Sequence, residues 1–229
     1  MPKLFIVATP IGNLKDITLR AIETLRSVDL ILCEDTRRAK KLLETYDIKT
    51  KLMSYHQHST QSKVGEISEL LREYDTALIT DSGTPGICDP GNKLIAELVR
   101  ENLNIEIVPI PGASAVTALA SVSGCNTDSY TFLGFLPHKK GKETLLKFIA
   151  EANTPVIFFE SPYRIFKTLE RLKELLDPDR KIVLGRELTK LHETIYRGNT
   201  QQVIDLLKAT SSKGEFVIMI DKKTKKTTL

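Results

Sequence analysis

The chain has 229 residues, of which 41% are hydrophobic and 27% are charged. This composition is typical of a globular protein and excludes a disordered or collagen-like chain. The longest apolar runs, at 155–159 and 216–220, are far shorter than the roughly 20 residues of a membrane-spanning helix, and the opening residues do not resemble a signal peptide. Three widely spaced cysteines predict neither a disulfide framework nor a metal-binding pair, so we expect a protein of the reducing cytoplasm.

Positive charge is concentrated in the second half of the chain. Residues 125–229 contain 19 Lys and Arg against 13 Asp and Glu, whereas residues 1–124 contain 14 against 16. Lys139 and Lys140 belong to one basic cluster, and a second lysine-rich run lies at 222–226. A basic surface of this kind favours a phosphate-rich partner, and a solvated surface without a partner is the alternative.

Short apolar runs alternate with amphipathic segments along the first half. The runs that predict strands lie at 4–8, 30–33, 52–55, 77–80 and 105–109, and the segments that predict helices include 18–28 and 93–101. Because these runs are apolar throughout, they are typical of parallel strands that are covered on both faces.

The second half continues the alternation with one difference. Its predicted strands lie at 130–135, 156–159, 182–186, 194–197 and 216–220, with a helix at 165–176. The run at 194–197 follows 182–186 too closely for a helical crossover, so we expect an antiparallel pair and a mixed sheet. The sequence therefore predicts an α/β protein with two α/β domains, residues 1–124 and 125–229.

The loop at 81–91, after the fourth predicted strand, is the strongest candidate for a binding site. It contains three glycines, two prolines and two aspartates within eleven residues. Ligands of open parallel sheets bind beyond the carboxyl ends of the strands, and glycines allow a ligand to approach the backbone. Its carboxylates could accept hydrogen bonds from a ribose or neutralise a cation. The chain has no G-x-G-x-x-G or P-loop motif, which disfavours dinucleotide oxidoreductases and P-loop NTPases.

Other predicted strand ends carry further candidates. Arg37 follows the second strand, where it could bind phosphate; the alternative, which we favour, is that Thr36 only caps a helix. In the second half, Glu160, Glu187 and Lys190 are candidates for substrate contact or proton transfer, or for ordinary ion pairs. The H-x-H pair at 56–58 has no acidic or thiol partner at metal spacing, so we expect no metal site.

Six motifs follow one another in order along the chain. They are ATPIGNL at 8–14, CEDTR at 33–37, DSGTPGICDPG at 81–91, PGASA at 111–115, FFESPYR at 158–164 and GREL at 185–188. Together they resemble the tetrapyrrole methylase superfamily, and within it the ribosomal RNA small subunit methyltransferase I family. The first loop lacks the G-x-G-P-G-D pattern of the tetrapyrrole enzymes, and the loop at 81–83 reads Asp-Ser-Gly rather than Gly-Asp-Pro. Both departures favour the ribosomal branch.

The resemblance implies that S-adenosylmethionine donates a methyl group to the ribose 2′-hydroxyl of a decoding-region cytidine in 16S ribosomal RNA. It also implies two α/β domains with the cofactor between them, a homodimer, and no metal. The implied cofactor residues are Pro10, Asp81, Ser82, Gly83, Thr84, Pro85, Ser114, Ala115, Phe159 and Leu188. The candidates for RNA contact are Arg37, Lys139, Lys140 and Arg164, and those for the proton acceptor are Glu160, Glu187 and Lys190. A tetrapyrrole-type small-molecule methyltransferase and a non-catalytic, cofactor-binding module for ribosome assembly are the alternatives.

Overall fold

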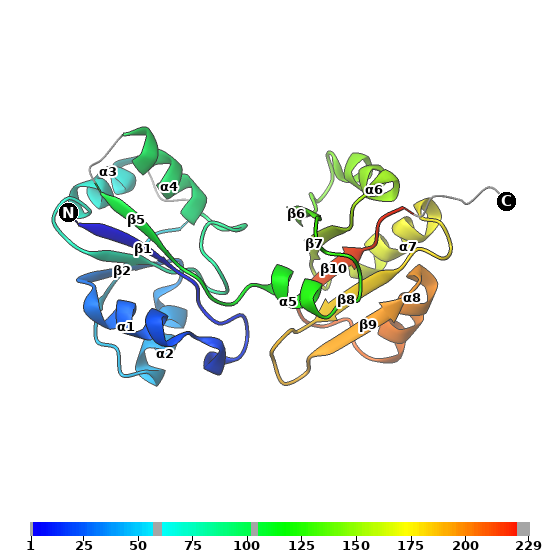
Figure 1. Ribbon diagram of the computed structural model, residues 1–229, viewed down its shortest axis with the longest axis horizontal. Helices are drawn as coiled ribbons and strands as arrows, with labels where there is room; N and C mark the ends of the chain where they lie inside the picture. Colours follow the sequence, from blue (N-terminus) through cyan, green and yellow to red (C-terminus); the bar gives the residue numbers. More distant parts are fainter. Residues whose placement is uncertain (1, 57–60, 102–104, 224–229) are drawn as a thin grey trace. The chain divides into compact units, whose positions relative to one another are not determined.

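The computed structural model describes residues 2–56, 61–101 and 105–223. It divides into two compact units, Met1–Ser114 and Ala115–Leu229 (Figure 1). Within the described residues, no helix is both long enough and apolar enough to cross a membrane.

The first unit is built on a five-stranded sheet with the order β3-β2-β4-β1-β5, and every neighbouring pair is parallel. The strands are β1 (Lys3–Val7), β2 (Leu30–Cys33), β3 (Lys51–Ser54), β4 (Thr76–Leu78) and β5 (Glu106–Ile110). The helices are η1 (Leu14–Asp16), α1 (Leu19–Ser27), α2 (Thr36–Thr45), α3 (Gln61–Leu70) and α4 (Gly91–Arg100). The predicted parallel sheet is confirmed.

Helices cover both faces of this sheet. Side chains of α1 and α2, including Leu25 and Leu43, pack with Ile31 on one face. Those of α3 and α4, including Leu94, pack with Leu4 on the other. From β1 the chain crosses to β2, and from β4 it crosses past β1 to β5. Connections that leave adjacent strands in opposite directions open a crevice at their carboxyl ends, where ligands of such sheets bind.

The second unit contains a mixed five-stranded sheet with the order β6-β7-β10-β8-β9. Its strands are β6 (Thr131–Phe135), β7 (Val156–Glu160), β8 (Ile182–Arg186), β9 (Thr194–Gly198) and β10 (Phe216–Ile220). Its helices are α5 (Ala115–Ser121), α6 (Lys142–Glu151), α7 (Ile165–Leu175) and α8 (Thr200–Ala209). Strands β6 and β7 are parallel and the other pairs are antiparallel, so the prediction of a mixed sheet is confirmed.

Helix α5 explains why the division falls at Ser114 rather than at the expected residue 124. It packs against β8 and β10 of the second unit. Gly185 on β8 makes this approach possible, because a Cβ atom there would lie 3.0 Å from Leu119 Cδ1 and 2.9 Å from Leu188 Cδ2. The residues of α5 therefore pack on the sheet of the second unit, although they follow directly from the last loop of the first.

Candidate functional site

The loops after β1 and β4 are joined at the carboxyl edge of the first sheet. Thr9 and Gly83 form an antiparallel bridge, with N···O distances of 2.9 and 3.1 Å. Gly83 has a φ of +84°, a conformation that only glycine adopts without strain, and a Cβ atom there would lie 3.3 Å from Ile11 Cγ2. The glycine thus holds the two loops together.

The loop after β4 also contacts the loop after β5. The hydroxyl of Thr84 donates to the carbonyl oxygen of Ala113 at 3.2 Å, next to Ser114. Pro10, Gly83 and Pro85 are buried, whereas Ser82 is exposed. The structure therefore brings the predicted residues of the first unit, Pro10, 81–85 and Ser114, into three interlocked loops at one edge of the sheet.

Two carboxylates connect the loops after β2 and β4. One oxygen of Glu34 accepts hydrogen bonds from the hydroxyl of Thr80 at 2.8 Å and from the backbone N–H of Asp81 at 3.4 Å. The Asp81 carboxylate accepts from the backbone N–H of Asp35 at 3.2 Å and pairs with Arg38 at 3.3 Å. The side chain of Asp81 stays 27% exposed, so a ligand can still reach it.

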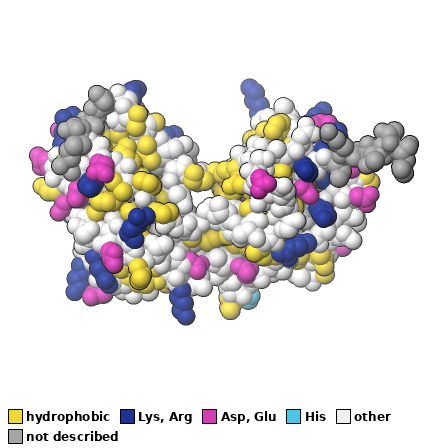
Figure 2. All heavy atoms as spheres, viewed as in Figure 1, with side chains coloured by type: hydrophobic (Ala, Val, Ile, Leu, Met, Phe, Trp, Pro, Cys, Tyr) yellow, Lys and Arg dark blue, Asp and Glu magenta, His cyan; other side chains and the backbone are white. Residues whose placement is uncertain are grey.

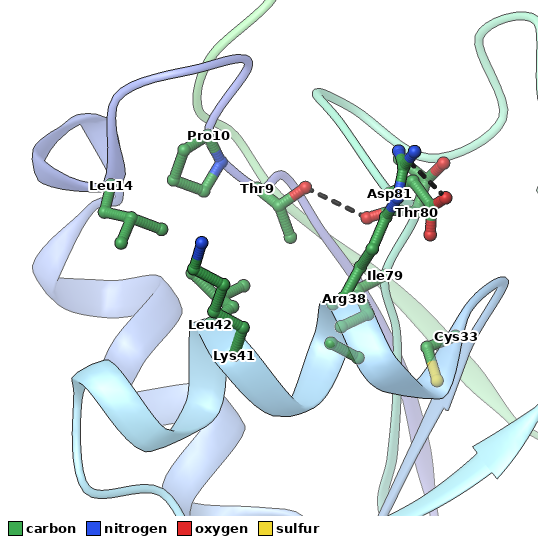
Figure 3. Close-up of a pocket in the computed structure, with 11 residues that line it drawn as sticks. Thr9, Pro10, Leu14, Cys33, Arg38, Lys41, Leu42, Ile79, Thr80 and Asp81 are labelled. Atoms are coloured by element: carbon green, nitrogen blue, oxygen red, sulfur yellow. Dashed lines mark hydrogen bonds and ion pairs between the residues drawn. The ribbon is translucent and has the colours of Figure 1, made fainter.

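A pocket of about 210 Å³ opens between α2 and these loops (Figure 3). Its apolar wall includes Pro10, Leu14, Leu42 and Ile79, and its polar lining consists of Thr9, Thr80, Asp81, Arg38 and Lys41, with Ala39 and Cys33 completing it. Burial and the nearby carboxylates of Asp81 and Asp35 raise the pKa of Cys33 to about 11, so its thiol is protonated at neutral pH.

Neighbouring arginines of α2 have different roles. Arg37, the predicted phosphate ligand, is 89% exposed and forms two hydrogen bonds with Asp35, at 3.1 and 2.7 Å. These bonds lower the pKa of Asp35 to about 2. Asp35, rather than Thr36, caps α2, accepting a hydrogen bond from the backbone N–H of Arg37 at 2.8 Å. Arg38 lines the pocket together with Lys41; both belong to the charged segment that the sequence indicates as a possible phosphate site, although Arg37 is the residue predicted there.

The second aspartate of the glycine-rich loop has a structural role. One oxygen of Asp89 accepts hydrogen bonds from the backbone N–H groups of Gly86 at 2.9 Å and Gly91 at 2.7 Å. A Cβ atom on Gly91 would lie 2.8 Å from that oxygen, so glycine is required there. Asp89 thus closes the turn before α4.

In the second unit, Glu160 lies at the centre of a buried ionic cluster. Its side chain is 0% exposed and pairs with Lys142 at 3.1 Å and Arg164 at 2.6 Å. It also accepts hydrogen bonds from the hydroxyl of Thr168 at 2.7 Å and from the backbone N–H of Ser161 at 2.9 Å. Both carboxylate oxygens are therefore occupied, which favours a structural role over the predicted role as a base.

The same cluster engages Arg164, a predicted RNA ligand. Besides Glu160, its guanidinium contacts the hydroxyl of Ser161 at 3.2 Å and the carbonyl oxygen of Leu136 at 2.9 Å. These contacts hold the segment between β6 and α6, on which Lys139 and Lys140 are exposed. The geometry favours Arg164 as a support for that segment rather than as a direct phosphate ligand.

Glu187 and Lys190 form an ionic group with Glu215. The ammonium group of Lys190 lies 3.0 Å from both carboxylates. Partial burial lowers the pKa of Lys190, but its hydrogen bonds to Glu187 and Glu215 outweigh that effect and leave it above the usual value. Burial likewise raises the pKa of Glu187, while hydrogen bonds from Glu215 N–H and Lys190 bring it below its usual value. A protonated Lys190 cannot accept a proton, and Glu187 is weakened as a base.

The remaining predicted cofactor residues belong to the second unit. Ala115 begins α5, Leu188 is buried against Gly185, and Phe159 packs edge-on against Phe132 with ring centroids 5.1 Å apart. Their contact with a cofactor stays a prediction. Within the described residues, no three His, Cys, Asp or Glu side chains are grouped so as to hold a metal ion; the second histidine of the H-x-H pair lies outside those residues.

Comparisons with known proteins connect this site to a family. The family model of tetrapyrrole (corrin/porphyrin) methylases matches residues 3–204. The chain is 43% identical to ribosomal RNA small subunit methyltransferase I of Thermotoga maritima over 97% of this chain and 100% of that one. It is 45% identical to the protein of the same name from Hydrogenobaculum sp., over 96% of each chain.

Solved structures share the fold at much lower identity. A diphthine synthase has a TM-score of 0.75 and 15% identity, covering 98% of this chain and 91% of that one. A cobalt precorrin-4 methyltransferase has a TM-score of 0.68 and 18% identity, covering 96% and 94%. These likenesses show the fold alone, whereas the near-full-length relatives at more than 40% identity show the family. The chain belongs to the tetrapyrrole methylases, and within them to the ribosomal RNA small subunit methyltransferase I family.

Proposed function

We propose that this protein transfers a methyl group from S-adenosylmethionine to the ribose 2′-hydroxyl of a cytidine in the decoding region of 16S ribosomal RNA. The observation that carries the proposal is its identity of 41–45% to proteins named ribosomal RNA small subunit methyltransferase I, over at least 95% of this chain. The specific nucleotide and the 2′-oxygen come from the resemblance of the motifs.

The interlocked loops of the first unit suit such a cofactor chemically. They combine buried prolines, a glycine whose backbone a ligand can approach, and the partly exposed carboxylate of Asp81. Apolar walls and backbone groups suit adenine, and a carboxylate suits the positively charged methionine end. Bound there, S-adenosylmethionine would supply a methyl group on a sulfonium that is already activated for transfer. We assign the cofactor role to Pro10, 81–85 and Ser114.

The protein's own contribution to the reaction is then mainly alignment. None of the three candidates for the proton acceptor has the surroundings of an effective base: Glu160 is fully engaged, Lys190 is protonated and the pKa of Glu187 is lowered. Holding a hydroxyl in line with a reactive carbon removes a large part of an activation barrier by itself. We propose that the site positions the ribose and that solvent receives its proton.

Positive charge on the second unit supports an RNA substrate. Lys139 and Lys140 are exposed beside the Glu160 cluster, which fixes their segment. On the face shown in Figure 2, Lys and Arg side chains are mixed with Asp and Glu over each unit, so attraction to RNA would come from local clusters rather than from one uniform basic face. The homodimer implied by the resemblance is a further part of the proposal.

The proposal is tested by incubating the protein with S-adenosylmethionine carrying a labelled methyl group and, in separate reactions, small subunits, naked 16S rRNA, large subunits and a tetrapyrrole acceptor. We expect label in small-subunit RNA. If no acceptor is labelled although calorimetry shows that the protein binds the cofactor, a non-catalytic assembly module would be favoured. Transfer only to a tetrapyrrole acceptor would favour the small-molecule alternative.

A further inference from the structure

The pocket between α2 and the loops after β1 and β4 has features that the cofactor does not explain. Its volume is about 210 Å³. Pockets that bury a whole drug-sized ligand measure about 300–1,000 Å³, so this one accommodates a single ring system rather than a complete cofactor. All of its lining residues belong to the first unit, which makes it a property of that unit alone.

The pocket carries more positive than negative charge. Arg38 and Lys41 line it, against the single carboxylate of Asp81, and Arg38 already pairs with that carboxylate at 3.3 Å. In Figure 3 the Lys41 side chain extends from α2 toward Pro10 and Leu14. S-adenosylmethionine is itself a cation without a phosphate, so these two side chains are better matched to a ligand that carries an anionic group.

The lining offers both apolar and polar groups. Pro10, Leu14, Leu42 and Ile79 offer flat apolar contacts, whereas Thr80 and Asp81 end the pocket at the carboxyl end of β4. A nucleobase needs apolar contact for its faces and polar partners for its edge, and a carboxylate accepts a hydrogen bond from the exocyclic amine of cytosine.

We propose that this pocket receives the base of one unstacked nucleotide of the RNA substrate, against Leu14 and Leu42, with the phosphate of that nucleotide at the exposed Arg38 and Lys41. Pro10 and Asp81, which we also assign to the cofactor, lie where the two ligands meet, because a methyl donor and its acceptor must be adjacent. The proposal rests on the proposed function, which makes RNA the substrate. Enzymes that act on a base take it out of its stack, and a preformed pocket offsets the cost. Methylation of a ribose does not itself require this, but a pocket that holds the unstacked base also fixes the position of the ribose joined to it.

Helix α2 and the loop after β1 offer matched controls. Lys40 precedes Lys41 but pairs with Glu44 at 3.7 Å and does not line the pocket. Leu14 is 36% exposed at the pocket, whereas Leu19 is 79% exposed outside it. Lys41→Ala and Leu14→Trp therefore perturb the pocket, and Lys40→Ala and Leu19→Trp make the same chemical changes elsewhere. Arg38→Ala is a third pocket variant.

The experiment measures equilibrium binding of small subunits as a function of salt, the methylation KM and kcat, and cofactor affinity by calorimetry. We expect Lys41→Ala and Arg38→Ala to weaken RNA binding by about tenfold or more. Each should also reduce the slope of log affinity against log salt by about 0.7. Leu14→Trp should raise KM without changing that slope, and both controls should behave as wild type.

Three results separate the possibilities. RNA binding at wild-type strength in all three pocket variants would overturn the proposal while leaving the methyltransferase function standing. Equal losses of cofactor and RNA affinity would assign the pocket to the cofactor and also overturn it. Failure of the proposed function would show instead in the wild-type protein, as absence of methyl transfer to small subunits. Circular dichroism of each variant checks that the fold is retained.

Discussion

Replacement of Glu160 by alanine should destabilise the second unit strongly. The change removes the anion that Lys142 and Arg164 share, and the side chains of both cations are only 15% exposed. Removing one partner of a buried ion pair costs about 3–5 kcal/mol, because the remaining charge is left without compensation. Domains are commonly stable by only about 5–15 kcal/mol, so this loss is a large fraction of the total.

Hydrogen exchange with peptide resolution suits this prediction because the chain has two units and no tryptophan to report on unfolding. Amides of β7 should exchange roughly 10²- to 10⁴-fold faster in Glu160→Ala, whereas amides of β1 in the first unit should be unchanged. The control is Glu170→Ala, whose exposed pair with Lys208 at 3.6 Å should contribute at most about 1 kcal/mol. A β7 exchange rate within tenfold of wild type would refute the inferred role of the cluster.

Three further predictions follow from single residues. Gly83→Ala should lower the free energy of unfolding in urea by about 1–2 kcal/mol, because alanine is strained at φ +84° and its Cβ atom would crowd Ile11. An unchanged free energy of unfolding would show that the loop relaxes. Cys33, buried and with its pKa raised to about 11, should resist iodoacetamide at pH 8 while the exposed Cys88 is alkylated, as mass spectrometry would show; equal labelling would contradict the burial of Cys33. Because its pKa is raised, Lys190 is a cation at acidic and neutral pH, so Lys190→Met should leave the acidic limb of the pH–rate profile in place. Loss of that limb would identify Lys190 as the base.

Much of the fold could be predicted because it depends on local patterns. Apolar runs and their spacing predict the parallel first sheet and the mixed second one, and both are confirmed. The position of α5 could not be predicted in the same way. Its small residues do not show which sheet they pack on, because the strands that α5 contacts, β8 and β10, are far away in sequence.

Only part of the candidate site could be predicted from the sequence. Pro10 and the loop at 81–85 could be predicted, because parallel topology brings strand ends together at one edge. The choice between Arg37 and Arg38 depends on the rotation of α2 about its axis, which the buried side chains of Ala39, Leu42 and Leu43 determine. The two ion pairs of Glu160 could not be predicted either, because Lys142 and Arg164 meet its carboxylate only in the folded chain.

The proposed 2′-O-methylation is tested most directly by alkaline hydrolysis of 16S rRNA labelled with methyl groups by this protein. Alkali cleaves RNA through attack of the 2′-hydroxyl on the adjacent phosphate, so a 2′-O-methyl group protects one linkage. The account predicts that the label is recovered in an alkali-resistant dinucleotide that begins with cytidine, and that the protected linkage maps to a single decoding-region position. Label in mononucleotides methylated on the base, or no label in small-subunit RNA, would contradict it.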